Sequence, residues 1–196
     1  MNTRLKVAVL ISGRGSNLKA LIEACAAPAY PAQIVLVISN HADAGGLAYA
    51  KDAGIATAIV EHKHFASRDA FDAAMQKHLD EAGTQLICLA GFMRILSEGF
   101  VCRWQGRMIN IHPSLLPTFK GTHVHERVLA SGARTSGCTV HYVTVELDSG
   151  PTILQAEVPV LPRDTPESLA ARVLEAEHIL YPLALRKIAE ERITPQ

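Results

Sequence analysis

Five consecutive apolar residues at positions 7–11 lead directly into a glycine-rich turn and then into a predicted helix that extends to about residue 26. Uninterrupted apolar runs of this kind are typical of parallel strands that are covered on both faces. Similar runs occupy residues 34–38 and 86–90. The pattern predicts an α/β fold with a mostly parallel twisted sheet and helices on both faces.

The remaining strands and helices are indicated by apolar patterns, by helix-capping residues and by glycine and proline residues that end an element. Further strands are predicted at residues 55–60, 108–112, 138–143 and 152–158, and further helices at residues 47–53, 68–81 and 126–131. Thr165 and Pro166 open a long last helix as its cap and first helical residue. The segment between the last two strands is too short for a parallel crossover, so the sheet should be mixed. No linker or repeat interrupts residues 1–196, which predicts a single domain.

Composition limits the classes of partner. The 19 Lys and Arg residues balance the 19 Asp and Glu residues, so the chain lacks the general basic surface that nucleic acids or anionic membranes attract. The first apolar run is too short for a signal peptide or a membrane span, and we expect a cytoplasmic protein. The 4 cysteines have no Cys-x-x-Cys spacing and are expected to be reduced core residues: Cys25, Cys88, Cys102 and Cys138.

The stretch at residues 108–112 predicts a buried strand that presents two polar side chains on one face. Alternate residues of a strand share a face, so Asn110 and His112 point the same way. Pro113 lacks a backbone donor and ends the strand, which places His112 at the carboxyl end, where ligands bind in open α/β sheets. Buried amide and imidazole groups are costly unless they are paired or used. The stretch therefore indicates either a functional pair or a hydrogen-bonded core pair.

The turn after the first strand has the features of a phosphate site. Gly13 and Gly15 allow close approach of the backbone to an anion, and Ser16 and Asn17 add side-chain donors at the start of a helix. The turn is not a Walker loop, and Leu18 stands where the dinucleotide fingerprint has its third glycine. The alternative is a tight turn without a ligand.

Two further segments can each be interpreted in two ways. The apolar loop at residues 91–96 follows a predicted strand, which indicates either a surface for a flat organic ligand or simple loop packing. Glu177 lies close to the apolar face of the last helix. Periodicity alone favours a solvated helix residue there, because a buried lone carboxylate would need a partner.

The histidine pairs do not have the features of a metal site. His62 with His64, and His123 with His125, lack a nearby cysteine and the spacing of a structural zinc site. We therefore expect no metal. His123 and His125 follow the loop after the central strand and could face a ligand there. His141, on a predicted strand, is interpreted as a buried, hydrogen-bonded histidine.

Four motifs in order make the chain similar to a known family. They are Ser12-Gly13-x-Gly15-Ser16-Asn17-Leu18, Ala90-Gly91-Phe92-Met93-Arg94-Ile95-Leu96, Asn110-Ile111-His112-Pro113-Ser114-Leu115-Leu116-Pro117 and Glu146-Leu147-Asp148-x-Gly150-Pro151. Over residues 7–188 the chain resembles the glycinamide ribonucleotide formyltransferases, which are folate-dependent enzymes of purine synthesis.

The resemblance implies a Rossmann-like formyltransferase fold and transfer of a formyl group from the co-substrate 10-formyltetrahydrofolate to the amine of glycinamide ribonucleotide. It implies a phosphate-binding half, about residues 1–100, and a folate-binding and catalytic half, about residues 101–196, in a monomer or homodimer. The implied ribonucleotide-binding residues are Gly13, Gly15, Ser16, Asn17 and Glu177. The implied folate-binding residues are Arg68, Met93, Arg94, Ile95, Leu96, Asn110, Thr144, Val145, Glu146, Leu147 and Asp148.

The chemistry of formyl transfer suggests three catalytic residues. Asn110 can donate a hydrogen bond to a developing oxyanion, and His112 titrates near neutral pH and can exchange protons. Asp148 can orient the imidazole or relay protons through a water molecule. This hypothesis requires neither a metal nor a covalent nucleophile.

Three other functions compete with this hypothesis. A 10-formyltetrahydrofolate deformylase shares the Asn, His and Asp set but carries an additional amino-terminal domain, for which the first strand leaves no room. A methionyl-tRNA formyltransferase needs a tRNA-binding extension and a basic surface. A non-catalytic nucleotide-binding module would explain the glycine turn but not the polar residues at positions 110, 112 and 148.

Overall fold

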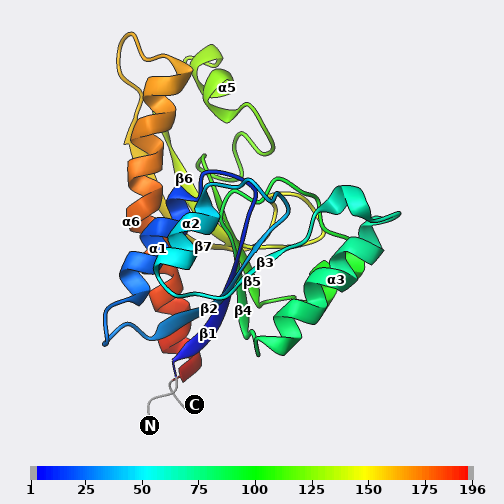
Figure 1. Ribbon diagram of the computed structural model, residues 1–196. Coiled ribbons are helices and arrows are strands. Elements are labelled where there is room, and N and C mark those ends of the chain that lie inside the picture. The colour runs from blue at the N-terminus through cyan, green and yellow to red at the C-terminus, as the bar shows by residue number, and fades with distance from the viewer. Residues whose placement is uncertain (1–3, 194–196) are drawn as a thin grey trace.

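A seven-stranded sheet organises the computed structural model, which describes residues 4–193 (Figure 1). Its strands lie in the order β3-β2-β1-β4-β5-β6-β7. The strands are β1 (Leu5–Ile11), β2 (Ala32–Ser39), β3 (Thr57–Ile59), β4 (Leu86–Leu89), β5 (Met108–His112), β6 (Thr135–Tyr142) and β7 (Thr152–Pro159). The α-helices are α1 (Ser16–Cys25), α2 (Gly46–Asp52), α3 (Arg68–Glu81), α4 (Glu98–Arg103), α5 (Val124–Ala130) and α6 (Pro166–Ile193), and His62–His64 form a short 3-10 helix.

The sheet is mixed, as the short connection between the last strands predicted. Neighbouring strands from β3 to β5 pair in parallel, whereas β5 with β6 and β6 with β7 pair antiparallel. The chain passes from β1 outward to β2 and β3 and then returns to place β4 on the other side of β1. Such a reversal of strand order opens a crevice beyond the carboxyl ends of the two strands, where α/β proteins bind ligands.

Helices cover both faces of the sheet, as predicted. One core cluster contains apolar residues of α1, α2, α5 and α6, and a second cluster on the other face contains those of α3 and α4. Figure 1 shows α1 and α6 together on one side of the strands and α3 on the other. Because both faces are covered, β1 and β4 are buried along nearly their whole length, which explains their uninterrupted apolar sequences.

The structure differs from the predicted elements mainly in short segments. Helix α4 was not predicted, because six residues are too few to show a helical period. Ser97 starts this helix, since its hydroxyl accepts a hydrogen bond from the backbone N–H of Phe100. Strand β6 begins earlier than predicted, at Thr135, because its first residues pair with the end of β7.

The expectation of four core cysteines is wrong for one of them. Cys25, Cys88 and Cys138 are buried, and all four thiols are free, but Cys102 is exposed. Cys102 lies on the outward side of α4, whose buried positions are Phe100 and Val101.

Between residues 4 and 193, none of the helices is both long and apolar enough to cross a membrane.

Candidate active site

Three strands bring the candidate site residues to one edge of the sheet. At the ends of β1 and β4, the backbone N–H of Ser12 donates to the carbonyl of Gly91 over 3.2 Å. On the next strand, Asn110 of β5 pairs in register with Leu89 of β4. The end of β5 therefore lies beside the point where the strand order reverses. This is the edge at which the carboxyl ends of parallel strands offer a ligand site.

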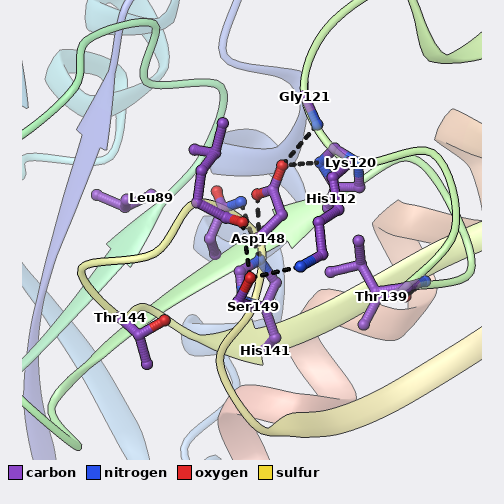
Figure 2. Close-up of polar contacts among 12 residues, drawn as sticks. Leu89, His112, Lys120, Gly121, Thr139, His141, Thr144, Asp148 and Ser149 are labelled. Atoms are coloured by element: carbon purple, nitrogen blue, oxygen red, sulfur yellow. Dashed lines mark hydrogen bonds and ion pairs between the residues drawn. The ribbon is translucent and has the colours of Figure 1, made fainter.

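Asp148 reaches His112 from a distant turn. Its carboxylate oxygen Oδ2 lies 3.4 Å from Nδ1 of His112, and both side chains are 7% exposed. The same oxygen accepts a 2.9 Å hydrogen bond from the backbone N–H of Gly121 (Figure 2). Asp148 has a left-handed backbone with φ 49°, which aspartate tolerates better than most residues. In the same turn, a side chain at Gly150 would meet the Tyr142 carbonyl oxygen at 1.8 Å, so only glycine fits.

His141 joins this group from β6, so the interpretation of a merely buried histidine was incomplete. Its Nε2 lies 3.7 Å from Oδ1 of Asp148 and 3.3 Å from the side-chain nitrogen of Asn110. Its Nδ1 contacts the Tyr142 carbonyl over 2.9 Å, and because a carbonyl only accepts, Nδ1 carries the proton. Burial lowers the pKa of His141. In the neutral ring, Nε2 then accepts from Asn110, which keeps its second amide hydrogen available.

Both ring nitrogens of His112 face oxygen atoms. Nε2 lies 3.0 Å from the carbonyl oxygen of Phe119, which requires a proton on Nε2, while Nδ1 faces the Asp148 carboxylate. An imidazolium with two N–H groups satisfies both partners. A substrate oxygen would have to replace the Phe119 carbonyl to receive the Nε2 proton.

The loop after β5 is fixed to the antiparallel strands. The Thr139 hydroxyl donates to the Ser114 carbonyl over 2.6 Å and accepts from the backbone N–H of Leu116 over 3.1 Å. The side chain of Gln155 donates to the Leu116 carbonyl and to the Thr139 hydroxyl, each over 2.8 Å. These contacts hold the loop beside His112. Neither Thr139 nor Gln155 was expected to contribute, because the contacts depend on how β6 and β7 pack.

The segment at residues 12–17, here called the acceptor turn, is tied to the last helix. The side-chain nitrogen of Asn17 donates a 2.7 Å hydrogen bond to Oε2 of Glu177, and both residues are buried. The periodicity-based interpretation of Glu177 as a solvated residue is therefore wrong. Burial raises the pKa of Glu177, and the hydrogen bond from Asn17 opposes this shift in part. The side-chain oxygen of Asn17 is buried without a hydrogen-bond partner.

The glycines of the acceptor turn have different surroundings. Gly15 adopts φ 73°, and a Cβ there would lie 2.5 Å from the Cα of Gly46, at the start of α2. The Gly13 carbonyl accepts a 3.0 Å hydrogen bond from the N–H of Gly46, but nothing lies within 4 Å of a Cβ added at Gly13. Gly15 is thus required by packing, and Gly13 leaves open space beside the turn. Ser16, which opens α1, is half-buried.

The expected folate residues form exposed surfaces rather than one connected group. Met93 and Ile95 are 76% and 64% exposed on the loop at residues 91–97, here called the donor loop, and Val145 and Leu147 are 56% and 60% exposed. Exposed apolar side chains mark a binding surface where they form one contiguous patch. The other expected folate residues are placed as follows: Arg68 and Arg94 are exposed, Leu96 is buried in the core under α3, Thr144 donates to the Glu146 carbonyl, and Glu146 lies 3.7 Å from Lys120.

A separate surface groove of about 600 Å³ lies between α1 and α6. Its lining includes Ser16 of the acceptor turn, Tyr30 and Arg186. Its lining contains none of Asn110, His112 or Asp148, so it is distinct from the polar group at the end of β5.

The histidine pairs considered for metal binding have other surroundings: His125 is close enough to His112 for the two rings to interact electrostatically. His64 and His123 each contact a neighbouring glutamate, Glu61 at 3.7 Å and Glu126 at 3.5 Å. Among residues 4–193, no three His, Cys, Asp or Glu side chains are arranged to hold a metal ion. Burial lowers the pKa of His62 and of His125, whose Nδ1 has no partner.

Comparisons with known proteins give a consistent result. Residues 5–185 match the family model described as formyl transferase. The chain is 53% identical over 186 residues to the trifunctional purine biosynthetic protein adenosine-3 of Gallus gallus, but it spans only 18% of the length of that relative. It is 46% identical over 189 residues to the phosphoribosylglycinamide formyltransferase of Escherichia coli. This match covers 96% of this chain and 89% of that protein.

Solved structures agree with the sequence matches. The crystal structure of phosphoribosylglycinamide formyltransferase from Brucella melitensis superposes with a TM-score of 0.92 at 55% identity, over 95% of this chain and 96% of that chain. The crystal structure of glycinamide ribonucleotide transformylase 1 from Symbiobacterium toebii gives a TM-score of 0.93 at 44% identity, over 96% and 89% of the two chains.

Proposed function

The chain belongs to the formyl transferase family, and from this premise we propose that it is a phosphoribosylglycinamide formyltransferase. It transfers the formyl group of 10-formyltetrahydrofolate to the amine of glycinamide ribonucleotide and yields formylglycinamide ribonucleotide and tetrahydrofolate in purine synthesis. The observation that carries the proposal is the convergence of Asn110, His112 and Asp148, from two separate segments, on one polar group at the end of β5.

The reaction makes three demands on this group. The neutral amine of the acceptor attacks the formyl carbon, and the carbonyl electron pair moves to oxygen. Collapse of the tetrahedral intermediate breaks the bond from carbon to N10 of the folate. A proton lost from the incoming nitrogen must reach the departing nitrogen. No metal is needed for these steps, and the folate is a consumed co-substrate.

Side chains of the group meet two of these demands, the negative charge on oxygen and the proton transfer. The free amide hydrogen of Asn110 stabilises the oxyanion, an interaction typically contributing about 10²–10³ in rate. His112, whose Nδ1 faces the Asp148 carboxylate at 3.4 Å, adds a second donor to the oxyanion through Nε2. Asp148 orients the ring and can relay the proton through a water molecule.

We assign the acceptor phosphate to the turn formed by Gly13, Gly15, Ser16 and Asn17. The open space at Gly13 and the amino end of α1 suit an anion. Glu177, which Asn17 orients, contacts the glycinamide part of the acceptor. In this assignment, the acceptor approaches from the β1 side of the sheet and the folate from the other side of the crevice.

We assign the folate to the exposed apolar side chains of the donor loop and of residues 144–148, with Arg68 and Arg94 at the periphery. In this assignment both proposed halves contribute to both substrate sites. Residues 1–100 supply the acceptor turn and the donor loop, and residues 101–196 supply the catalytic group, residues 144–148 and Glu177. Both substrates are small molecules of central metabolism. The enzyme is therefore proposed to act in the cytoplasm, as a monomer or homodimer, without a nucleic-acid or membrane partner.

Acceptor-dependent turnover tests the proposal. The chain is mixed with 10-formyltetrahydrofolate, with and without glycinamide ribonucleotide, and the folate absorbance and the formylated product are followed. We expect turnover only when the ribonucleotide is present. Release of formate without the ribonucleotide would identify a hydrolase instead, and binding of the ribonucleotide without any turnover would identify a nucleotide-binding module.

A further inference from the structure

A reciprocal pair of hydrogen bonds joins the acceptor turn to the donor loop. The backbone N–H of Ser12 donates to the carbonyl of Gly91 over 3.2 Å, and the hydroxyl of Ser12 accepts from the backbone N–H of Met93 over 2.7 Å. The two segments follow neighbouring strands, β1 and β4. Ser12 thus belongs to the acceptor turn by sequence and holds the start of the donor loop by its side chain.

The far end of the donor loop has an independent anchor. Oδ2 of Asp72, a buried residue of α3, accepts a 2.6 Å hydrogen bond from the backbone N–H of Ser97. Between the two anchors, Met93 and Ile95 are largely exposed. The donor loop is therefore held at both ends, but only its first anchor lies in the segment assigned to the acceptor.

We propose that Ser12 is a positioning residue that couples the two substrate sites, so that each substrate binds more tightly when the other is present. The proposal rests on the function proposed above. A phosphate held by the N–H groups of the acceptor turn fixes the backbone that carries Ser12. A fixed Ser12 hydroxyl holds Met93 in place and lowers the entropy cost of ordering the donor loop around a folate. The coupling must be equal in both directions, because binding free energies are linked.

Equilibrium binding measures the coupling without turnover. The dissociation constant of the product tetrahydrofolate is determined by titration calorimetry, with and without saturating glycinamide ribonucleotide. The ratio of the two constants is the coupling factor, which we expect to be about 5-fold or more for the unmodified enzyme. Ser12→Ala should bring the factor close to one, and Ser12→Thr, which keeps an accepting oxygen, should restore most of it.

Two further variants separate coupling from general weakening. Asp72→Ala removes the other anchor and should weaken tetrahydrofolate binding equally with and without the ribonucleotide, which leaves the coupling factor unchanged. Ser168→Ala removes a hydroxyl that likewise accepts a backbone N–H, from Thr165 at the start of α6, and should change neither constant. A purely structural Ser12 would lower thermal stability in Ser12→Ala and leave the coupling factor as it was.

The outcomes distinguish this proposal from the proposed function. A coupling factor near one in the unmodified enzyme, or an undiminished factor in Ser12→Ala, overturns the role of Ser12 while acceptor-dependent turnover still stands. If the chain shows no formyl transfer, but its two ligands bind with coupling that Ser12→Ala abolishes, the positioning role of Ser12 is supported and the proposed function is overturned.

Discussion

The side-chain nitrogen of Asn17 donates a 2.7 Å hydrogen bond to the Glu177 carboxylate across the buried contact of α1 with α6. Glu177 is 7% exposed, and burial raises the pKa of its carboxyl group. A single neutral donor does not compensate fully for the lost hydration of a carboxylate. The protein alone therefore compensates the ionised carboxylate incompletely, and a ligand group that donates to Glu177 would supply a second partner.

Glu177→Gln should change how the stability depends on pH. The pKa of Glu177 is raised above its ordinary value of 4.5, so its contribution to stability is fully present below about pH 4.5 and is lost as the pH rises through the folded-state pKa. Glutamine cannot ionise but can still accept from Asn17. The free energy of unfolding of both proteins is measured in urea from pH 4.5 to 8. The difference, Glu177→Gln minus the unmodified protein, should increase as the pH rises. Parallel curves would contradict the raised pKa.

Asn110→Ala should reduce kcat by about 10²–10³, the usual effect of removing one oxyanion donor. The KM for glycinamide ribonucleotide should stay nearly constant, because in the proposed mechanism Asn110 donates to an oxygen that becomes charged only during transfer. Asn110→Asp is the matched control, since it keeps the shape of the side chain and removes its N–H groups. It should be as slow as the alanine variant. A fast aspartate variant would show that Asn110 only fills space.

Asp148→Asn isolates the charge of this side chain. Asparagine also tolerates the left-handed backbone at φ 49° and can accept the hydrogen bond from Gly121, so the turn should persist. The neutral amide no longer places a carboxylate beside Nδ1 of His112. We expect kcat to fall by about 10²–10⁴, as for loss of acid–base assistance, with little change in thermal stability. Steady-state kinetics and a melting curve together check this, and near-normal turnover would remove Asp148 from the mechanism.

Short-range patterns determine which parts of the fold could be predicted. The apolar runs of β1 and β4 reflect burial on both faces, and alternation along β5 places Asn110 and His112 together. Helix α4 escaped prediction because a local cap at Ser97 and two buried apolar residues, Phe100 and Val101, define it, and neither gives a clear period. The outward position of Cys102 follows from the same unpredicted helix.

Long-range contacts determine which parts of the site could not be predicted. Asn17 and Glu177 are 160 residues apart, and nothing in the periodicity of α6 indicates that a donor lies opposite the carboxylate. His141 reaches Asp148 only because β6 pairs antiparallel with β5 and sets His141 opposite Asn110. The role of Asp148 itself was suggested by resemblance and chemistry, while its approach to His112 depends on the tight turn at Gly150.

Tyr181→Phe should weaken the contact between α6 and the catalytic strand. The Tyr181 hydroxyl is fully buried one helical turn after Glu177 and donates to the carbonyls of Leu89 and Ile109, at 3.0 and 3.3 Å. Ile109 precedes Asn110, so we expect both a lower kcat and a loss of about 1 kcal/mol in stability. Tyr30→Phe, which removes a 2.7 Å bond to Pro182 away from β5, should lose stability without lowering kcat. Equal kcat values for the two variants would contradict the proposed effect of the Tyr181 hydroxyl on the position of Asn110.

Gly15→Ala should destabilise the acceptor turn by backbone strain and by a direct clash. At φ 73° the added Cβ would lie 2.5 Å from the Gly46 Cα, so one of the two backbones must move. Gly54→Ala is the control, because Gly54 has a similar φ of 68° and nothing lies within 4 Å of its Cβ. Gly54→Ala should lose about 1 kcal/mol from strain alone, and Gly15→Ala should lose clearly more in urea unfolding. Because the clash displaces the backbone that we assign to the acceptor phosphate, only Gly15→Ala should raise the KM for glycinamide ribonucleotide, by about 10-fold or more if one phosphate hydrogen bond is lost. Equal losses of stability in the two variants, with unchanged KM values, would show that contact with α2 does not shape the turn.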